Sequence, residues 1–65
     1  MIIQRYYTIE DTEESRMVLN IIRDLIPCYI IKAPDGMWKA KIAIEADIKD
    51  FEAIEDILSP LIEDF

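Results

Sequence analysis

The 65-residue chain contains no histidine, one cysteine and one glycine, and each shortage narrows what the protein can do. Without histidine, general acid–base catalysis would depend on carboxylates, lysine or tyrosine, and a zinc site would lack a common ligand. Cys28 stands alone and cannot form an internal disulfide, and Gly36 alone cannot build a glycine-rich phosphate loop. We therefore expect a protein that is not an enzyme and that uses no metal or other cofactor.

Long apolar runs are also missing. No stretch approaches the ~20 residues that span a bilayer, and the opening residues Met-Ile-Ile-Gln-Arg lack the layout of a signal peptide. Cys28 has no basic neighbour in the sequence that would activate its thiol, so we expect it to pack as a small hydrophobic residue. An unpaired cysteine fits a reducing compartment. The expected location is the cytoplasm, without membrane contact.

The composition is that of a folding sequence, with 52% hydrophobic and 32% charged residues. Residues 1–65 are expected to form a single small domain. A domain of about 60 residues buries only ~60% of the surface that its unfolded chain exposes, so its stability is marginal. A well-filled core or a second chain has to supply the rest.

The first half of the chain predicts a strand followed by a helix. Residues 2–9 are rich in β-branched and aromatic side chains, which is typical of a strand. Asp11-Thr12-Glu13-Glu14 then resembles a capping box at a helix start. Apolar residues recur at steps of three and four up to Pro27, which ends the helix; these are Met17, Val18, Ile21, Ile22, Leu25 and Ile26.

The middle of the chain predicts a hairpin. Residues 28–33 and 38–44 read as strands around Pro34-Asp35-Gly36, where glycine supplies the left-handed residue of a bulged turn. This turn sets Ala33 opposite Met37 and Lys32 opposite Trp38. The alternation of side chains then assigns one set to the face covered by helices, namely Cys28, Ile30, Trp38, Ala40, Ile42 and Ile44.

The last third predicts a second helix from Asp47, with Asp50 three residues on. Its apolar side would comprise Ile48, Phe51, Ile54, Ile57, Leu58, Leu61 and Ile62. Ser59-Pro60 should kink or restart this helix. A short fourth strand over 61–65 is the alternative.

These elements predict an α+β fold of order β-α-β-β-α. We expect a three-stranded mixed sheet of order 1-3-2, with the first strand parallel to the third and two helices packed on one face. This resembles a truncated ferredoxin-like fold, a split β-α-β unit without its last strand. The resemblance extends to small regulatory and ligand-sensing domains and implies no particular function.

Two surfaces follow from this arrangement. The first strand becomes a long edge that invites pairing with its copy or with a strand of a partner, although Arg5 and strand twist could protect it. With Ile3, Tyr7 and Ile9 facing inward, the sheet face without helices forms a partly apolar, partly basic platform for a partner. Its expected residues, together with the edge, are Gln4, Tyr6, Tyr29, Ile31, Met37, Lys39 and Lys41.

The formal net charge of −7 is unevenly distributed. Residues 47–65 hold seven acids against Lys49, whereas residues 27–46 are nearly neutral. The acids Glu52, Glu55 and Asp56 either form a solvated helix face or a partner-binding surface that competes with nucleic acid. The negative charge, and a third strand without alternating aromatics, argue against direct binding to nucleic acid.

The leading hypothesis is a small acidic protein–protein interaction module, homodimeric through its first strand, that regulates or inhibits a larger protein partner. Small inhibitors that phages make against host nucleic-acid enzymes have such properties. One alternative is a small-molecule-sensing ferredoxin-like domain of the ACT type, in which dimer interfaces bind amino acids or similar metabolites. Another is a structural subunit of a larger assembly.

Overall fold

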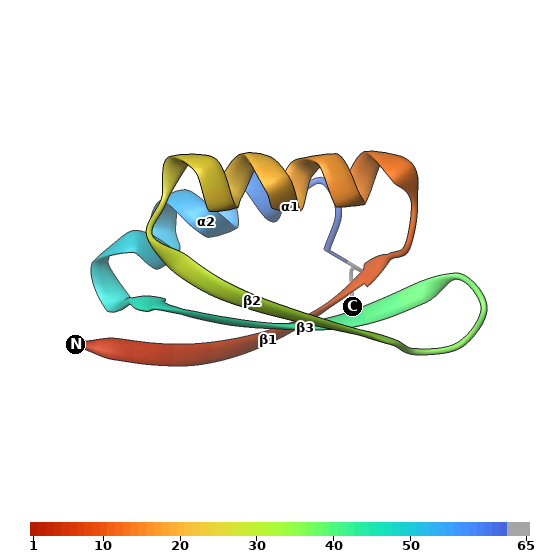
Figure 1. Ribbon diagram of the computed structural model, residues 1–65, viewed down its shortest axis with the longest axis horizontal. Coiled ribbons are helices and arrows are strands. Elements are labelled where there is room, and N and C mark those ends of the chain that lie inside the picture. The colour runs from red at the N-terminus through yellow and green to blue at the C-terminus, as the bar shows by residue number, and fades with distance from the viewer. Residues whose placement is uncertain (63–65) are drawn as a thin grey trace.

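The computed structural model describes residues 1–62 and shows two helices on one side of a sheet (Figure 1). In chain order the elements are β1 (Ile2–Glu10), α1 (Glu13–Leu25), β2 (Cys28–Pro34), β3 (Lys39–Asp47), the short 3-10 helix η1 (Ile48–Asp50) and α2 (Phe51–Leu58). The sheet order is β1-β3-β2, so the predicted α+β class and strand order are confirmed.

The sheet is antiparallel throughout, and the prediction of a mixed sheet is wrong. β3 pairs antiparallel with both β1 and β2. The physical reason lies in the connections. Helix α1 carries the chain back to the end at which β1 began, so β2 runs parallel to β1. The hairpin then reverses the chain, which makes β3 antiparallel to both neighbours.

Helix α1 begins with a capping box that differs by one residue from the predicted one. Thr12 is the N-cap: its hydroxyl accepts the backbone N–H of Ser15 at 3.1 Å, while the Ser15 hydroxyl accepts the backbone N–H of Thr12 at 3.0 Å. Glu13 and Glu14 lie in the first turn, where the helix dipole favours acids. The helix ends at Leu25, two residues before Pro27, as predicted.

The hairpin register is shifted by four residues of β3 from the predicted one, since Lys32 pairs with Ile42 and not with Trp38. Ile30 pairs with Ile44, Lys32 with Ile42 and Pro34 with Ala40, so the loop spans residues 35–38. In the observed register Ile44 has Ile30 as its partner, whereas in the predicted register Ile44 would lie beyond the end of β2. Gly36 has the expected positive φ, of 90°.

Because that shift is an even number of residues, the strand faces keep their predicted sides. The covered face buries Ile30, Ala40, Ile42 and Ile44, while Cys28 is partly buried. Trp38 is the exception, since it lies in the loop rather than in a strand and is 75% exposed. Its assignment to the covered face is wrong.

The predicted second helix, which was expected from Asp47, is divided into a short 3-10 helix and an α-helix. Asp47 caps η1 by accepting the backbone N–H of Lys49 at 3.2 Å, and α2 starts only at Phe51. The helix ends at Leu58, so Pro60 stops it rather than kinking it. Beyond it, Ile62 forms an antiparallel bridge with Ile9. The rest of the alternative fourth strand over 61–65 lies outside the described residues.

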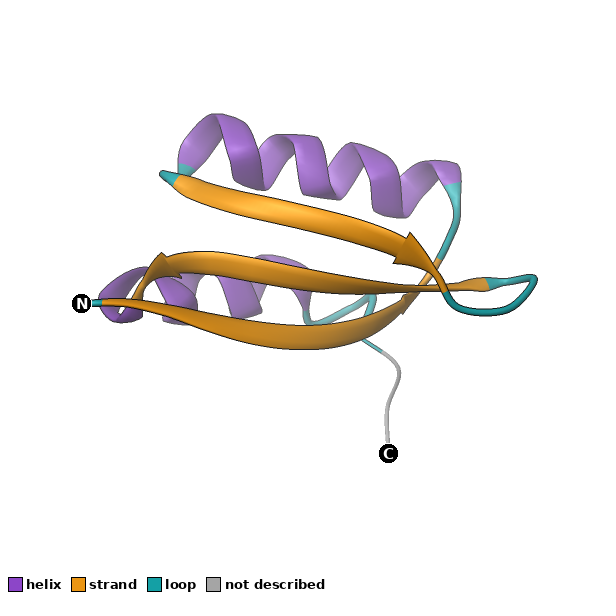
Figure 2. Ribbon diagram, turned by 60° about the horizontal axis from the view of Figure 1, so that its bottom comes forward, coloured by secondary structure: helices purple, strands orange, loops and turns teal. Residues whose placement is uncertain are grey.

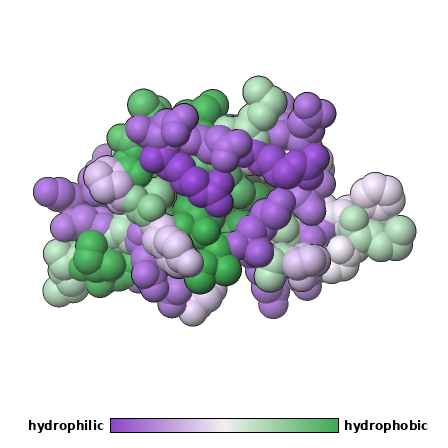
Figure 3. Space-filling view, in the orientation of Figure 1, coloured by the Kyte–Doolittle hydropathy of each residue, from purple (hydrophilic) through white to green (hydrophobic). Residues whose placement is uncertain are grey.

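The core lies between the sheet and the two helices. Its largest fully buried side chains come from every main element except β2; they are Ile9, Leu19, Ile22, Ile42, Ile44, Phe51, Ile54 and Leu58. The predicted stripe of α1 is only half buried, because Met17, Ile21 and Leu25 remain 59%, 46% and 69% exposed. Figure 3 shows hydrophobic residues along the upper rim of the molecule, over α1. No helix within residues 1–62 is long and apolar enough to cross a bilayer.

Candidate interaction surfaces

Figure 2 shows the sheet in front of the two helices, with the face opposite the helices toward the viewer. By strand register, this face carries most of the predicted partner-binding residues. Register places them in cross-strand rows. One row runs Tyr6–Ala43–Ile31, and the next runs Gln4–Glu45–Tyr29. Tyr6, Tyr29 and Ile31 are 73%, 62% and 49% exposed. We call this group of side chains, with Ala43 at its centre, the open-face patch.

Polar side chains frame the open-face patch. On one side the Tyr6 hydroxyl donates to Gln4 Oε1 at 2.9 Å, and Gln4 Nε2 lies 3.4 Å from a carboxylate oxygen of Glu45. On the other side Lys41 stands opposite Thr8, and Lys39 opposite Glu10. The patch is therefore apolar at its centre and polar at its rim, which is the usual anatomy of a protein–protein interface.

Met37 does not belong to this patch. It lies in the loop between β2 and β3, beside Trp38, and is 85% exposed. The hairpin extends beyond the helices in Figure 1, so the two side chains form a separate apolar tip. The predicted hairpin register placed Met37 and Trp38 in paired strand positions. The sequence-based prediction therefore missed that both residues lie in the loop.

The outer edge of β1 adjoins the open-face patch. In antiparallel pairing, alternate residues direct their N–H and C=O groups to the neighbouring strand. The backbone N–H of Asp11 donates to Trp38 at 2.8 Å, and that of Ile48 to Met1 at 2.9 Å, so the odd-numbered residues of β1 face β3. The backbone groups of Ile2, Gln4, Tyr6 and Thr8 therefore point to the outer edge. Among residues 1–62, the only bridge on that edge joins Ile9 to Ile62.

The edge of β2 is chemically different. The backbone N–H of Asp35 donates to Lys39 at 2.9 Å, so the odd-numbered residues of β2 face β3 and Pro34 faces outward. Proline has no N–H to offer an incoming strand, and an outward position costs the sheet no hydrogen bond. The backbone groups of Lys32 also face this edge, and its side chain stands on the covered face of the same strand, where its charge hinders edge pairing.

A polar cluster holds β1 against α2. The Tyr7 hydroxyl donates to Glu55 Oε2 at 2.7 Å, and a guanidinium nitrogen of Arg5 lies 2.9 Å from the same oxygen. The Arg5 guanidinium also lies 4.9 Å from the centre of the Phe51 ring. The hydrogen bond from Tyr7 lowers the pKa of Glu55. Burial, with the same bond, raises the pKa of Tyr7 to about 12.

This cluster changes the interpretation of the acidic helix. The carboxylate of Glu55 is engaged within the fold, whereas Glu52 and Asp56 are exposed on α2. Two of the three predicted acids are thus directed to solvent. No local pattern in the sequence predicts this contact, because Tyr7 and Glu55 are 48 residues apart.

A shallow concavity of about 370 Å³ lies at the β1 edge, lined by Tyr6, Tyr7, Thr8 and Lys41.

Cys28 is partly buried, and desolvation raises the pKa of its thiol. Within residues 1–62, no group of three His, Cys, Asp or Glu side chains is arranged to hold a metal ion. Every buried side-chain N or O atom in that range has a hydrogen-bond partner.

No protein-family model matches this chain, and no curated protein or solved structure matches it either.

Proposed function

We propose that this protein is a small protein–protein interaction module that works by contact, and that two copies associate through β1. The observation that carries the proposal is the continuity between the outward backbone groups of β1 and the open-face patch. An incoming strand would complete the sheet and extend the patch at the same time. In this proposal the fold is ferredoxin-like, and the outer edge of β1 is the edge at which the complete ferredoxin-like fold has a further strand.

Charge permits such self-association. Arg5 is the only charged side chain between Ile2 and Ile9, and it is paired with Glu55 of the same chain. The edge itself therefore carries no uncompensated charge to repel a second copy. The whole chain carries −7, so two copies still repel each other at long range. Added salt shortens the range of that repulsion to ~10 Å at 0.1 M.

The proposed dimer regulates or inhibits a larger protein through the open-face patch. In a two-fold pairing the patches of two copies lie side by side on one continuous sheet and offer a wider apolar platform. Glu52 and Asp56 would contribute charge complementarity to a basic partner. Because Glu55 is held within the fold, the acidic helix has the smaller part in this proposal.

Light scattering coupled to size-exclusion chromatography tests the self-association. The wild type should elute with twice the 7.6 kDa mass of one chain, and the dimer fraction should rise with salt. Gln4→Pro removes an outward N–H, while Gln4→Ala removes the same side-chain contacts and keeps the N–H. We expect the proline variant to be monomeric and the alanine variant to remain dimeric.

Circular dichroism should show that both variants keep the fold, since neither change touches a bond between β1 and β3. Tyr7→Pro is unsuitable, because the N–H of Tyr7 faces β3 and its loss would damage the sheet. A wild type that stays at 7.6 kDa at high concentration and salt would contradict self-pairing. A mass that is equal in both Gln4 variants would contradict pairing through β1.

The concavity at the β1 edge favours a second candidate, the sensing of a small metabolite. A ligand bound by Tyr6, Thr8 and Lys41 would lie at the proposed dimer interface, where ACT-type domains bind amino acids. A panel of metabolites separates the two candidates by thermal shift. A ligand that binds only the folded state at a hundred times its Kd stabilises it by about 2.7 kcal/mol.

A further inference from the structure

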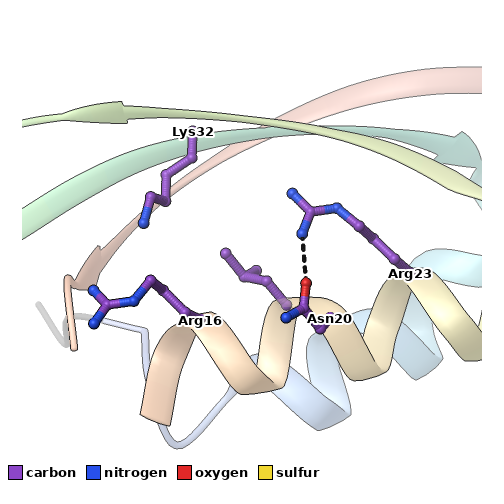
Figure 4. A pocket seen from close by; sticks show the side chains of 5 residues that line it. Arg16, Asn20, Arg23 and Lys32 are labelled. Atoms are coloured by element: carbon purple, nitrogen blue, oxygen red, sulfur yellow. Dashed lines mark hydrogen bonds between the residues drawn. The ribbon is translucent and has the colours of Figure 1, made fainter. Parts of the chain in front are cut away.

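Basic side chains converge on a groove between α1 and β2, on the opposite flank from the β1 edge. The groove is lined by Arg16, Leu19, Asn20, Arg23 and Lys32 and has a volume of about 210 Å³. Figure 4 shows Arg16, Asn20 and Arg23 projecting from α1 on one side and Lys32 projecting from the sheet on the other. One water needs only about 10–15 Å³ of such space, so the groove has room for a much larger group.

Local structure explains why these side chains meet. Arg16, Asn20 and Arg23 follow one another at steps of four and three, which places them on one flank of α1. Lys32 lies two residues after the buried Ile30, so it stands on the covered face of β2 but near its end. Leu19 is 2% exposed and forms the apolar floor.

The charge of this groove is opposite to that of the molecule. The chain has seven basic residues and fourteen acids, yet three of the seven line this one groove. Asp11 is the acid that contacts them: its Oδ1 lies 3.2 Å from Arg16 and 3.0 Å from Lys32. Lys32 accordingly lowers the pKa of Asp11. Two positive charges remain uncompensated among these four groups.

Arg23 differs from the other two cations. Among residues 1–62 it forms no ion pair; instead it donates to Asn20 Oδ1 at 3.0 Å. That bond holds the guanidinium in place and leaves the Asn20 amide nitrogen as a further donor. Two guanidinium groups, an ammonium and an amide thus surround one space. Guanidinium groups bind phosphate oxygens in a bidentate manner, which makes this donor set suited to phosphate.

We propose that this groove binds a phosphate monoester, whose dianion neutralises the two uncompensated charges. A phosphate at pH 7 carries about −1.5 to −2 and three acceptor oxygens, which match the charge and donors of the groove. A long nucleic acid does not fit the proposal, because the chain as a whole carries a net charge of −7. At about 0.15 M salt the Debye length is ~8 Å, so the groove's own charges dominate at contact.

Titration of the ¹⁵N-labelled full chain with inorganic phosphate tests the proposal, with chloride added to a second sample at matched ionic strength. We expect saturable shifts at Arg16, Leu19, Asn20, Arg23 and Lys32, and none in the chloride sample. Arg23→Gln should weaken binding about tenfold or more. Lys49→Gln removes the same charge from η1, outside the groove, and should leave binding unchanged.

Asp11→Asn provides a test in the opposite direction. It adds one unit of positive charge beside the groove and should tighten phosphate binding several-fold. Shifts that do not saturate, or equal losses in Arg23→Gln and Lys49→Gln, would overturn the proposal, because they would indicate diffuse attraction rather than a site. Glycerol 3-phosphate and a phosphoserine tripeptide then distinguish the sources, since the tighter binder shows whether a metabolite or a phosphorylated side chain is preferred.

Discussion

The contact between Tyr7 and Glu55 should contribute measurably to stability, since it joins the first strand to the last helix. A charge-assisted hydrogen bond contributes about 1.5–3 kcal/mol where it is well shielded from water. Glu55 is partly exposed, with 41% of its side-chain surface accessible, so screening by solvent reduces this value. We expect a coupling free energy of about 1 kcal/mol.

A double-mutant cycle measures this coupling. Tyr7→Phe removes the hydroxyl and keeps the ring, and Glu55→Ala removes the acceptor at a position where alanine favours the helix. The free energy of unfolding is measured by urea titration for the wild type, both single variants and the double variant. Each kcal/mol corresponds to a fall in Tm of about 4–8 °C for a domain of this size.

Arg5 complicates the cycle, because it shares the carboxylate oxygen with Tyr7. The same cycle in an Arg5→Gln background shows whether the coupling belongs to the Tyr7–Glu55 pair. The coupling should persist there. If the double variant loses the sum of the two single losses to within about 0.3 kcal/mol, the two side chains do not interact and the proposed attachment of β1 to α2 is wrong.

Three further predictions concern pH, the helix cap and the hairpin loop. The pKa of Tyr7 is raised to about 12 in the folded state. The stabilisation of the fold by the protonated Tyr7 hydroxyl is therefore fully present below pH 10 and is lost as the pH rises from about 10 to 12. The free energy of unfolding of the wild type should therefore fall more steeply in that range than that of Tyr7→Phe. Ser15→Ala removes the acceptor for the Thr12 N–H and should cost about 1 kcal/mol in a urea titration, whereas loss of the exposed hydroxyl in Ser59→Ala should cost almost nothing. Gly36→Ala should cost about 1 kcal/mol, measured in the same way, because φ is 90° there although nothing lies within 4 Å of the added Cβ. A neutral effect of Gly36→Ala would show that the loop relaxes to another conformation.

Local patterns predicted the elements well, and pairing between distant elements was harder to predict. The helix over Glu13–Leu25 and the strands follow from periodicity and from Pro27, which act over a few residues. The direction of β1 relative to β3 depends on how the whole chain is connected. The register of the hairpin depends on how many residues of β3 find a partner on β2. Neither the strand direction nor the hairpin register can be predicted from the residues of one segment alone.

The same distinction applies to the candidate surfaces. The open-face patch was predictable because alternation along a strand survives a register shift of an even number of residues. The exposure of Trp38 was not, since it depends on where the strand ends. The pairing of Glu55 with Tyr7, and the approach of Lys32 to Arg16 and Arg23, required the tertiary arrangement of elements far apart in the chain.

The two proposed surfaces lie on opposite flanks of the molecule, and the sheet connects them. Within residues 1–62, the β1 edge offers outward backbone groups from Ile2 to Tyr6 that no neighbouring strand pairs with, and it has no uncompensated charge, whereas the β2 edge carries Pro34 and the basic groove. Pairing through β1 would therefore leave both grooves of a dimer exposed at its two ends. Phosphate binding at the groove should then be independent of the oligomeric state, and Gln4→Pro should bind phosphate with the affinity of the wild type. A tenfold difference between the two would show that the surfaces are coupled through the sheet.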